Sequence, residues 1–419
     1  MISGYSTKTT RVFCGSFDGC FFPGTIRRFV VLILTMEMTH SIRSWTGLTC
    51  TLAFCIISAP ESRAQYGSPP AKAPPNAGYT VTRFDSDLTK LALHQDARLV
   101  NPWGIVLTNG LLVVADNGPG LVTTYAPGTG TASRASILVP PPTGSPGPAA
   151  PSGLALNPTK DFLIGHLIGH PEHEAAAQYF IATEDGTVSA WNSASGTNAV
   201  LVIDHSSSNA VYKGIAVATA SIGPALYVAN FRSNMIEVYD TNFAFVTWFT
   251  DPSMGALGFA PFNIRIFQNK LVVAFAKQDA QHHDDVPGPG NGYVDIFNTN
   301  GTLVRSFAAQ GALNSPWGLA IAPLNFGKFS QALLVGNFGD GWINAYNLLT
   351  GEYLGALADE SGNPIALGGL WGLSFNVDPA AGNVEYNATT LYFTQGLNGE
   401  NDGVLGSIKP ILPLYPPVH

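Results

Sequence analysis

The chain has 419 residues, of which 46% are hydrophobic and only 11% charged, and its net charge is −8. This acidic balance argues against nucleic acid and anionic membranes as partners. Glycine (45) and proline (30) are abundant, and together with many short β-branched runs they predict an all-β fold. The body of the chain has no apolar run long enough to cross a bilayer, so we expect no transmembrane body.

Residues 1–64 have the pattern of a leader with a signal peptide. A short basic segment begins at Met38, a small-residue-rich apolar segment covers residues 45–59, and Ser62-Arg63-Ala64 fits a cleavage site before Gln65. The pattern predicts an exported protein that is periplasmic, surface-bound or secreted, with Met36 or Met38 as the true start. A membrane-anchored N-terminus is the alternative.

Cleavage at this point would remove every cysteine, because all four precede residue 65. The processed chain would keep 14 basic and 25 acidic side chains, a net charge of −11, and would depend on its core for stability. Residues 65–78 read as a Pro/Ala-rich linker and residues 411–419 as a Pro-rich tail. We therefore expect the folded domain over residues 79–410.

A four-strand pattern recurs six times in this domain. Each copy begins with an inner strand whose glycine, or its equivalent Asn263, follows the previous one by 49–61 residues. The inner strands are expected to begin at Trp103, Ser152, Lys213, Phe262, Trp317 and Trp371. The sixth copy lacks a fourth strand, which residues 79–84 (YTVTRF) can supply. We predict a six-bladed β-propeller of four-stranded blades, closed by the N-terminal strand at about Tyr79–Phe84.

Antiparallel order brings the start of each inner strand and the loop between the second and third strands to one face, here called the mouth. The candidate ligand-binding residues are those expected on this face. They are Asn101, Trp103, Asp116, Asn117, Glu184, Asp185, Asn230, Arg232, Asn263, Lys277, Asp279, Trp317, Asn337, Asp340 and Trp371. The tryptophans either pack between blades or form platforms for a sugar or another apolar-faced ligand. The short polar residues either form turns or contact ligand.

The loop over residues 277–292 is longer than its counterparts and polar, which favours a functional role. Asp279, His283, Asp284 and Asp285 offer imidazole and carboxylate ligands for calcium or another divalent metal. Neighbouring side chains on an extended chain point in opposite directions, so a shared ion would require a bend. A solvated loop without metal is the alternative.

Several motifs together resemble an uncharacterised family of exported propellers, found mainly in bacteria and also known from a giant virus. The resemblance is carried by NPWGI, ATEDGTVSAWN, YVANFRSNMIEVYD, SPWGLAIAP, VGNFGDGWINAYN and NGENDGVLGSIKP, and by the whole of the 277–301 segment. It implies the propeller fold and an exported address, and it adds no catalytic residue. More distantly, the chain looks like NHL-type and gluconolactonase-type propellers. The latter hold calcium with a glutamate at an inner-strand start, which none of the six copies has.

The sequence thus predicts a monomeric ligand-binding or protein-interaction module whose mouth engages a small molecule, a glycan or a protein. Two alternatives stay open: a calcium-type metal-dependent hydrolase or lactonase, and a structural envelope protein. No nucleotide-binding loop, G-x-S-x-G elbow or HExxH motif is present, and no residue is assigned a catalytic role.

Overall fold

A computed structural model of the chain describes residues 78–411, apart from residues 134, 166, 168, 170–173 and 376–388. The predicted leader, almost all of the linker and all but the first residue of the tail lie outside this part of the chain. Within the described part, no helix has the length and apolar character needed to cross a bilayer.

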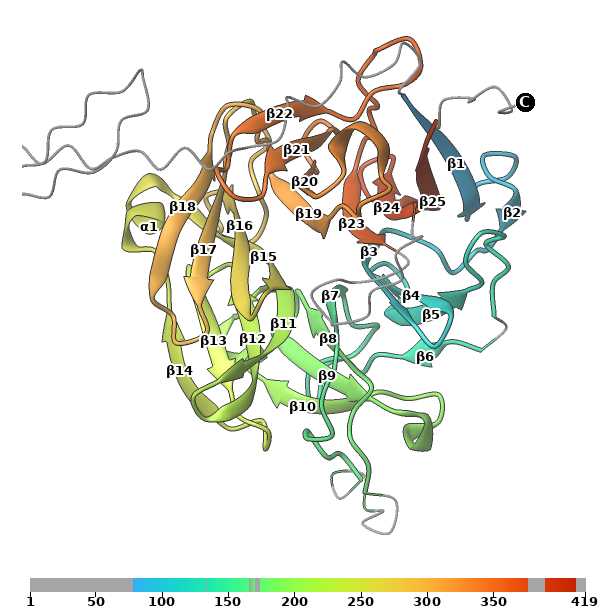
Figure 1. The fold of residues 1–419 in the computed structure, drawn as a ribbon. Coiled ribbons are helices and arrows are strands. Elements are labelled where there is room, and N and C mark those ends of the chain that lie inside the picture. Colours follow the sequence, from blue (N-terminus) through green and yellow to red (C-terminus); the bar gives the residue numbers. More distant parts are fainter. Residues whose placement is uncertain are drawn as a thin grey trace, which may run out of the picture. The chain divides into compact units, whose positions relative to one another are not determined.

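Six sheets are arranged around a common centre like the blades of a propeller (Figure 1). Blade 1 contains β3 (Pro102–Thr108), β4 (Leu111–Asp116), β5 (Leu121–Tyr125) and β6 (Ile137–Leu138). Blade 2 contains β7 (Pro151–Leu156), β8 (Tyr179–Thr183), β9 (Thr187–Trp191) and β10 (Val200–Asp204). Blade 3 contains β11 (Tyr212–Ala220), β12 (Gly223–Asn230), β13 (Met235–Tyr239) and β14 (Phe245–Phe249).

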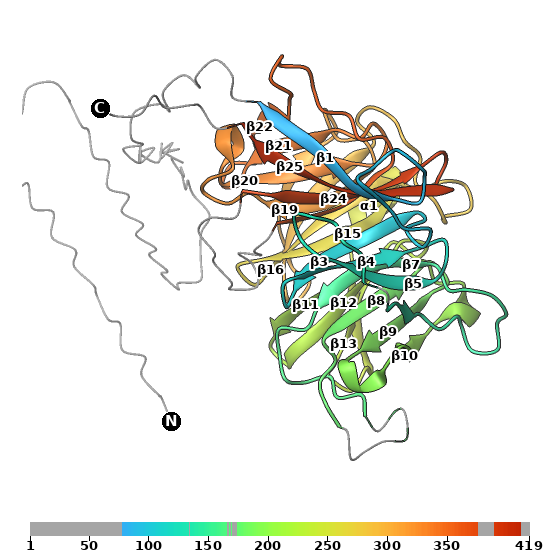
Figure 2. The ribbon, with the colours of Figure 1, turned by 90° about the vertical axis from the view of Figure 1, so that its right-hand side faces the viewer.

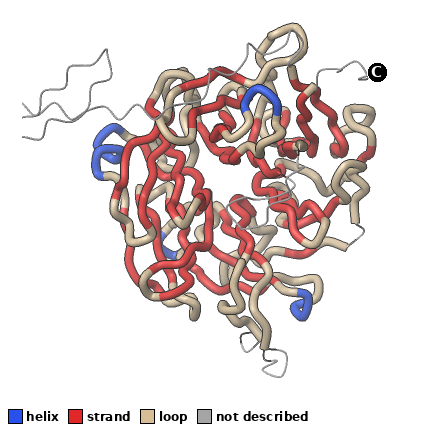
Figure 3. The backbone as a smooth tube through the Cα atoms, viewed as in Figure 1, coloured by secondary structure: helices blue, strands red, loops and turns tan. Residues whose placement is uncertain are grey.

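Blade 4 contains β15 (Phe259–Phe267), β16 (Lys270–Lys277), β17 (Gly292–Asn298) and β18 (Leu303–Ala309). Blade 5 contains β19 (Pro316–Ile321), β20 (Ala332–Asn337), β21 (Ile343–Asn347) and β22 (Tyr353–Ala356). The helical segments whose full extent is described are α1 (Pro252–Leu257) and three 3-10 turns, at Ser193–Ser195, Ser206–Ser208 and Gly327–Phe329. They lie in connections between strands, as Figure 3 shows. The predicted all-β, six-bladed architecture is confirmed.

Blade 6 combines the two ends of the folded chain. β23 (Leu370–Phe375), β24 (Leu391–Leu397) and β25 (Asp402–Pro410) are followed in the sheet by β1 (Tyr79–Ser86), and β2 (His94–Gln95) adds a short parallel edge (Figure 1). Figure 2 shows β1 beside β25 from another side. β1 runs antiparallel to β25, with Tyr79 opposite Pro410. The predicted closure is confirmed, because the N-terminal strand covers an edge that would otherwise be unpaired.

The core is divided into clusters that lie between neighbouring blades. Tyr227 and Ile236 of blade 3, for example, pack with Ile264 and Phe275 of blade 4. Similar clusters join the remaining neighbours, including blade 6 to blade 1 through Tyr392 and its partners. Because each blade buries its two faces against two neighbours, the ring is stable only as a whole.

The start of each inner strand has a local irregularity that positions the site. The pairing of all six inner strands shifts register there, as between Pro102 and Ile105 in blade 1. A bulge of this kind redirects a side chain. The neighbouring glycines permit close approach of the blades: a Cβ on Gly372 would lie 2.5 Å from the carbonyl oxygen of Trp103. The residue before each glycine is thereby brought to the centre of the ring.

Candidate ligand-binding site

An aromatic plug fills the centre of the ring beneath the mouth. It consists of Trp103, Phe262, Trp317 and Trp371 from four inner strands, with Phe338 from a loop of blade 5. Trp103 stacks on Trp371 with ring centroids 3.5 Å apart, and Trp317 meets both edge-on. The three indoles are only 1–3% exposed. They act as packing residues between blades and offer no open ring face to a sugar.

Blade 3 places a lysine where blades 1, 5 and 6 place tryptophan. The Lys213 side chain is 1% exposed, and its ammonium lies 5.0 Å from the ring centroid of Trp103 and 5.8 Å from that of Phe231. It forms ion pairs with Glu184 of blade 2 and, at 3.3 Å, with Oδ1 of Asp284 in the long loop of blade 4. A buried ion pair contributes little net stability because desolvation offsets the attraction. This position therefore favours a functional interpretation.

A continuous set of hydrogen bonds runs round the mouth and joins five blades. We call it the mouth network; its members are Asn101, Asn117, Glu184, Lys213, His283, Asp284 and Glu400. The amide of Asn101 donates to Asn117 (3.3 Å) and to Glu400 (3.2 Å). Asn117 in turn donates to Glu184 at 2.8 Å. The Nδ1 atom of His283 lies 2.9 Å from Oδ1 of Asp284, which completes the chain of contacts.

The plug and the mouth network are connected through Asn101. Its side-chain oxygen accepts a hydrogen bond of 3.1 Å from Nε1 of Trp371, and its backbone has a left-handed conformation with φ of 46°. Asparagine is one of the few residues that tolerate this conformation. The NPWGI segment thus positions one amide that connects the buried rings to the polar mouth.

Glu400 occupies a strained position at the mouth. Its φ is 69°, in the left-handed region that glutamate seldom adopts. Burial, followed by the negative charge of Glu184, raises the pKa of Glu400 to about 7. Only its Oε2 atom receives a hydrogen bond from the described residues, from Asn101. Its other oxygen remains available as an acceptor.

The charges of the other network members are set by their contacts. The hydrogen bond with Asp284 raises the pKa of His283, and the same bond lowers the pKa of Asp284 to about 2, assisted by Lys213. Burial alone would lower the pKa of Lys213, but the charges of Glu184 and Asp284 outweigh it and the pKa is raised. The mouth near neutral pH therefore contains a permanent ammonium surrounded by carboxylates.

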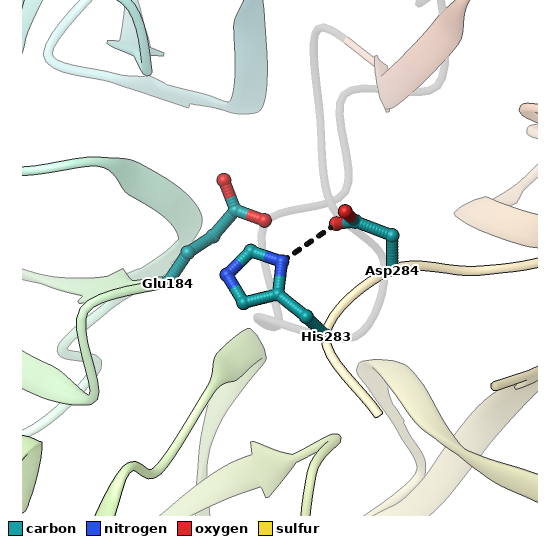
Figure 4. A group of neighbouring side chains, drawn as sticks. All are labelled: Glu184, His283 and Asp284. Carbon is teal, nitrogen blue, oxygen red and sulfur yellow. Dashed lines mark hydrogen bonds and ion pairs between the residues drawn. The ribbon is translucent and has the colours of Figure 1, made fainter. Parts of the chain in front are cut away.

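Glu184, His283 and Asp284 are also the described residues best placed to share a metal ion. One ligand atom from each lies within 4.8 Å of the others, and Figure 4 shows the three side chains converging from blades 2 and 4. Of the other residues in the predicted metal set, Asp279 accepts the backbone N–H of His283 at 2.8 Å and so shapes the turn. Burial raises the pKa of Asp285 to about 6. The loop bends so that the neighbouring side chains of His283 and Asp284 can face one ion, as the metal hypothesis requires. The third member of the group is Glu184, and neither Asp279 nor Asp285 belongs to it.

Several other candidate residues form hydrogen bonds within or between the blades and do not belong to the mouth network. Asp116 is fully buried in blade 1 and accepts a hydrogen bond of 2.6 Å from Thr123. Asp185 accepts the backbone N–H of Ala150 at 2.7 Å. Asn230 donates at 2.7 Å to the buried Glu237 of blade 3. These contacts fit the turn-forming and packing interpretation of short polar residues.

The remaining candidates lie outside the network as well. Asn337 and Asp340 of blade 5 bond each other at 3.1 Å, and Asp340 also caps Trp342 N–H at 3.0 Å. Lys277 is exposed, with its ammonium 5.9 Å from the ring of Phe259. Arg232 is half-buried, and no described residue forms a hydrogen bond with its Nε atom.

Asn263 lines a cavity in the channel on the far side of the plug. This cavity lies between the inner strands and has a volume of about 180 Å³. Asn263 donates to the carbonyl of Trp317 at 2.7 Å, which ties blade 4 to blade 5. The cavity and the mouth network are thus separate features, and only the network combines several charged groups from different blades.

The sequence interpretation did not include Lys213 and Glu400 among the candidates. The signal for Lys213 was present: the residues before the six inner-strand glycines or their equivalent are Trp, Ser, Lys, Phe, Trp and Trp, and the lysine is the one charged member. Glu400 lies in the NGEND segment near the mouth, whose alternating oxygen ligands faintly resemble a calcium loop but lack the spacing of an EF-hand. Its burial depends on contacts with Asn101, nearly 300 residues away in the chain.

Comparison with known proteins gives relatives of matching length. "Uncharacterized protein R648" of Acanthamoeba polyphaga mimivirus is 32% identical over 342 residues, covering 79% of this chain and 80% of that protein. "Uncharacterized protein L690" of the same virus is 30% identical, covering 79% and 86%. The chain belongs to the same family as these viral proteins. The giant-virus part of the expected resemblance is therefore confirmed.

Solved structures add to this family assignment only the fold. A Bacteroides thetaiotaomicron structural genomics protein of unknown function matches with a TM-score of 0.50 and 10% identity, covering 80% of this chain and 76% of that one. No protein-family model matches the chain. What members of this family bind must be inferred from the mouth itself.

Proposed function

We propose that the protein is an exported ligand-binding module whose mouth takes a small, positively charged molecule. The observation that carries this proposal is the mouth network around the buried Lys213. Five blades contribute polar side chains to it, and most of their donors are already used inside the network. A set of side chains from separate blades held in one network is pre-organised for binding.

The atoms left open in the network are mainly acceptors. Among the described residues, none donates to Oε1 of Glu400 or to Oδ2 of Asp284. Three carboxylates, of Glu184, Asp284 and Glu400, stand against one lysine, and Asp285 is close by. An ammonium or guanidinium group would satisfy these acceptors and reduce the repulsion between the carboxylates. The hydroxyls of a neutral glycan could donate to these oxygens but would not reduce the repulsion, and the buried indoles give the sugar no platform.

The calcium-type hydrolase is less well supported by this geometry. Its ion would have to share Glu184 and Asp284 with the ammonium of Lys213. A binding module needs no such rearrangement. Export is supported by the leader pattern of residues 1–64, and the acidic processed chain is consistent with it.

Ligand binding is tested by calorimetry with spermidine, arginine and choline as cationic probes and glucose as a neutral probe. We expect saturable binding of at least one cation, weakened about tenfold or more by Glu400→Gln, which corresponds to the loss of one charged contact. The matched control is Asp161→Asn, since Asp161 is an exposed carboxylate in the β7–β8 connection of blade 2. Binding of glucose alone, or equal effects of the two variants, would refute the proposal.

Export is tested separately by expressing the full chain in a Gram-negative bacterium and sequencing the N-terminus of the product. The expected product begins at Gln65 and is found outside the cytoplasm. A product that retains residues 1–64 inside the cell would contradict export and would leave the ligand proposal unaffected.

A further inference from the structure

The ammonium of Lys213 lies at the point where the three potential metal ligands of the mouth converge. Glu184, His283 and Asp284 place their ligand atoms within 4.8 Å of one another. The ammonium bonds Oε1 of Glu184 and lies 3.3 Å from Oδ1 of Asp284, the same oxygen that contacts His283. The position that an ion would occupy between these carboxylates already carries a positive charge.

Lys213 is also held in place and kept charged. Its side chain is 1% exposed and is enclosed by Trp103 and Phe231, which flank the ammonium on the side of the plug. The neighbouring carboxylates raise its pKa despite its burial. A divalent ion approaching Glu184 and Asp284 would meet this fixed like charge in a poorly solvated site, where electrostatic repulsion is strong.

We propose that Lys213 is the resident cation of the mouth, which excludes divalent metal from a latent site formed by Glu184, His283 and Asp284. In this arrangement the lysine neutralises the carboxylates that a metal would otherwise bridge. The inference goes beyond the proposed ligand binding. The inference concerns the exclusion of divalent metal by Lys213, and it does not require that the mouth bind an organic ligand.

The ligand set identifies the metal that the latent site would take. One imidazole and two carboxylates match the nitrogen and oxygen ligands of zinc, whereas calcium prefers a larger set of oxygens only. Loss of the ammonium would leave Glu184 and Asp284 without their shared lysine beside His283, with an open volume where the lysine head had been. Zn²⁺ is therefore the appropriate probe.

The test compares Zn²⁺ binding, by calorimetry and thermal shift, in the wild type, Lys213→Ala and Lys213→Arg. We expect one Zn²⁺ to bind Lys213→Ala at least about tenfold more tightly than the wild type or Lys213→Arg, since Arg keeps the positive charge. Added Zn²⁺ should raise the melting temperature of Lys213→Ala only. The double variant Lys213→Ala/His283→Ala should lose this binding, which separates the site from the other histidines.

Lys213→Met serves as the second variant, because it removes the charge and retains most of the side-chain volume. If either variant folds and neither binds Zn²⁺, the proposal is wrong. Saturable Zn²⁺ binding by the wild type that Glu184→Gln abolishes would also overturn it. Should both variants be unfolded without metal, the proposal requires that Zn²⁺ restore folding, and failure to do so counts against it. The organic-cation titration of the wild type is unaffected by these outcomes.

Discussion

Two clusters of buried charge in this propeller differ in how completely their hydrogen bonds are satisfied. In blade 3, the buried Glu237 accepts hydrogen bonds from Tyr212 (2.7 Å), Tyr239 (2.5 Å) and Asn230 (2.7 Å). At the mouth, Lys213 is enclosed, but Glu400 and Asp284 keep oxygen atoms that no described residue contacts. The first cluster is closed by donors of blade 3 and by His205 from the connection after blade 2, which contacts the hydroxyls of Tyr212 and Tyr239, and it serves stability. The second draws on five blades and stays open.

The difference also explains why most of the predicted mouth residues have structural roles. A short polar side chain in a turn is usually satisfied by its own backbone, as Asp340 is in blade 5. Only charges that cross between blades remain available for a ligand. The comparison predicts that changes in the closed cluster affect stability alone, whereas changes at the mouth affect binding as well.

The largest effect is expected from Lys213→Ala, because it leaves buried carboxylates without a counter-charge. Breaking a buried ion pair costs about 3–5 kcal/mol, and we expect the lower end here because Asp284 is 65% exposed. Urea unfolding measures the change. Lys270→Ala is the control, since Lys270 is exposed at the far end of blade 4, and it should change stability by no more than about 0.5 kcal/mol. If Lys213→Ala and Lys270→Ala changed the free energy of unfolding equally, Lys213 would contribute no more to stability than an exposed lysine.

Tyr239→Phe tests the closed cluster. It deletes one hydrogen bond to the buried carboxylate of Glu237 and should cost about 2 kcal/mol, typical of a bond to a charged group. Binding of organic cations should remain within about twofold of the wild type, as judged by calorimetry. A larger change in affinity would mean that blade 3 transmits strain to the mouth, and the two clusters would then act together.

The titration of Glu400 should be visible as a pH dependence of stability. Its pKa in the folded protein is about 7, above its ordinary value of 4.5, so the folded state holds the proton more tightly than the unfolded chain. This contribution is complete below about pH 4.5 and is lost as the pH rises through 7. Glu400→Gln cannot ionise. The free energy of unfolding of the variant minus that of the wild type should therefore increase by about 1 kcal/mol between pH 5 and pH 8. This figure already includes a reduction for the partial exposure of the carboxylate. A difference that does not change with pH would contradict the burial of this carboxylate.

The smallest effect is expected from Asp340→Asn. Asp340 was a candidate ligand residue, but its contacts are with Asn337, Asn314 and the backbone of Trp342. The variant should bind organic cations as the wild type does, within about twofold. A loss comparable to that of Glu400→Gln would extend the site into blade 5.

The fold could be predicted from the sequence because its determinants are local and repeated. Alternating strands recur six times, and the one irregularity, a missing last strand, has a visible replacement at residues 79–84. The alternation within each strand lies within a few residues, so neighbouring sequence is sufficient to identify it. The closure was found by counting strands over the whole repeat array.

The site was harder to predict because its determinants lie far apart in the chain. Asn101 and Glu400 belong to opposite ends of the domain, and Glu184, Lys213 and Asp284 come from three blades. Periodicity places all of them on the mouth, but it does not indicate which will be buried. Trp103 illustrates the limit: the same position suits a ligand platform or a plug, and packing by Trp371 and Trp317 decides between them.

The pairing of β1 with β25 has a consequence for how the chain can be cut and rejoined. Because Tyr79 lies opposite Pro410, the two ends of the folded domain are neighbours in one sheet. A short linker could join them, and new termini could be opened in the exposed Asn109–Gly110 turn between β3 and β4 of blade 1. Such a circular permutant should keep the ring and the mouth. Deletion of residues 79–86, by contrast, should leave β25 as a bare edge prone to aggregation.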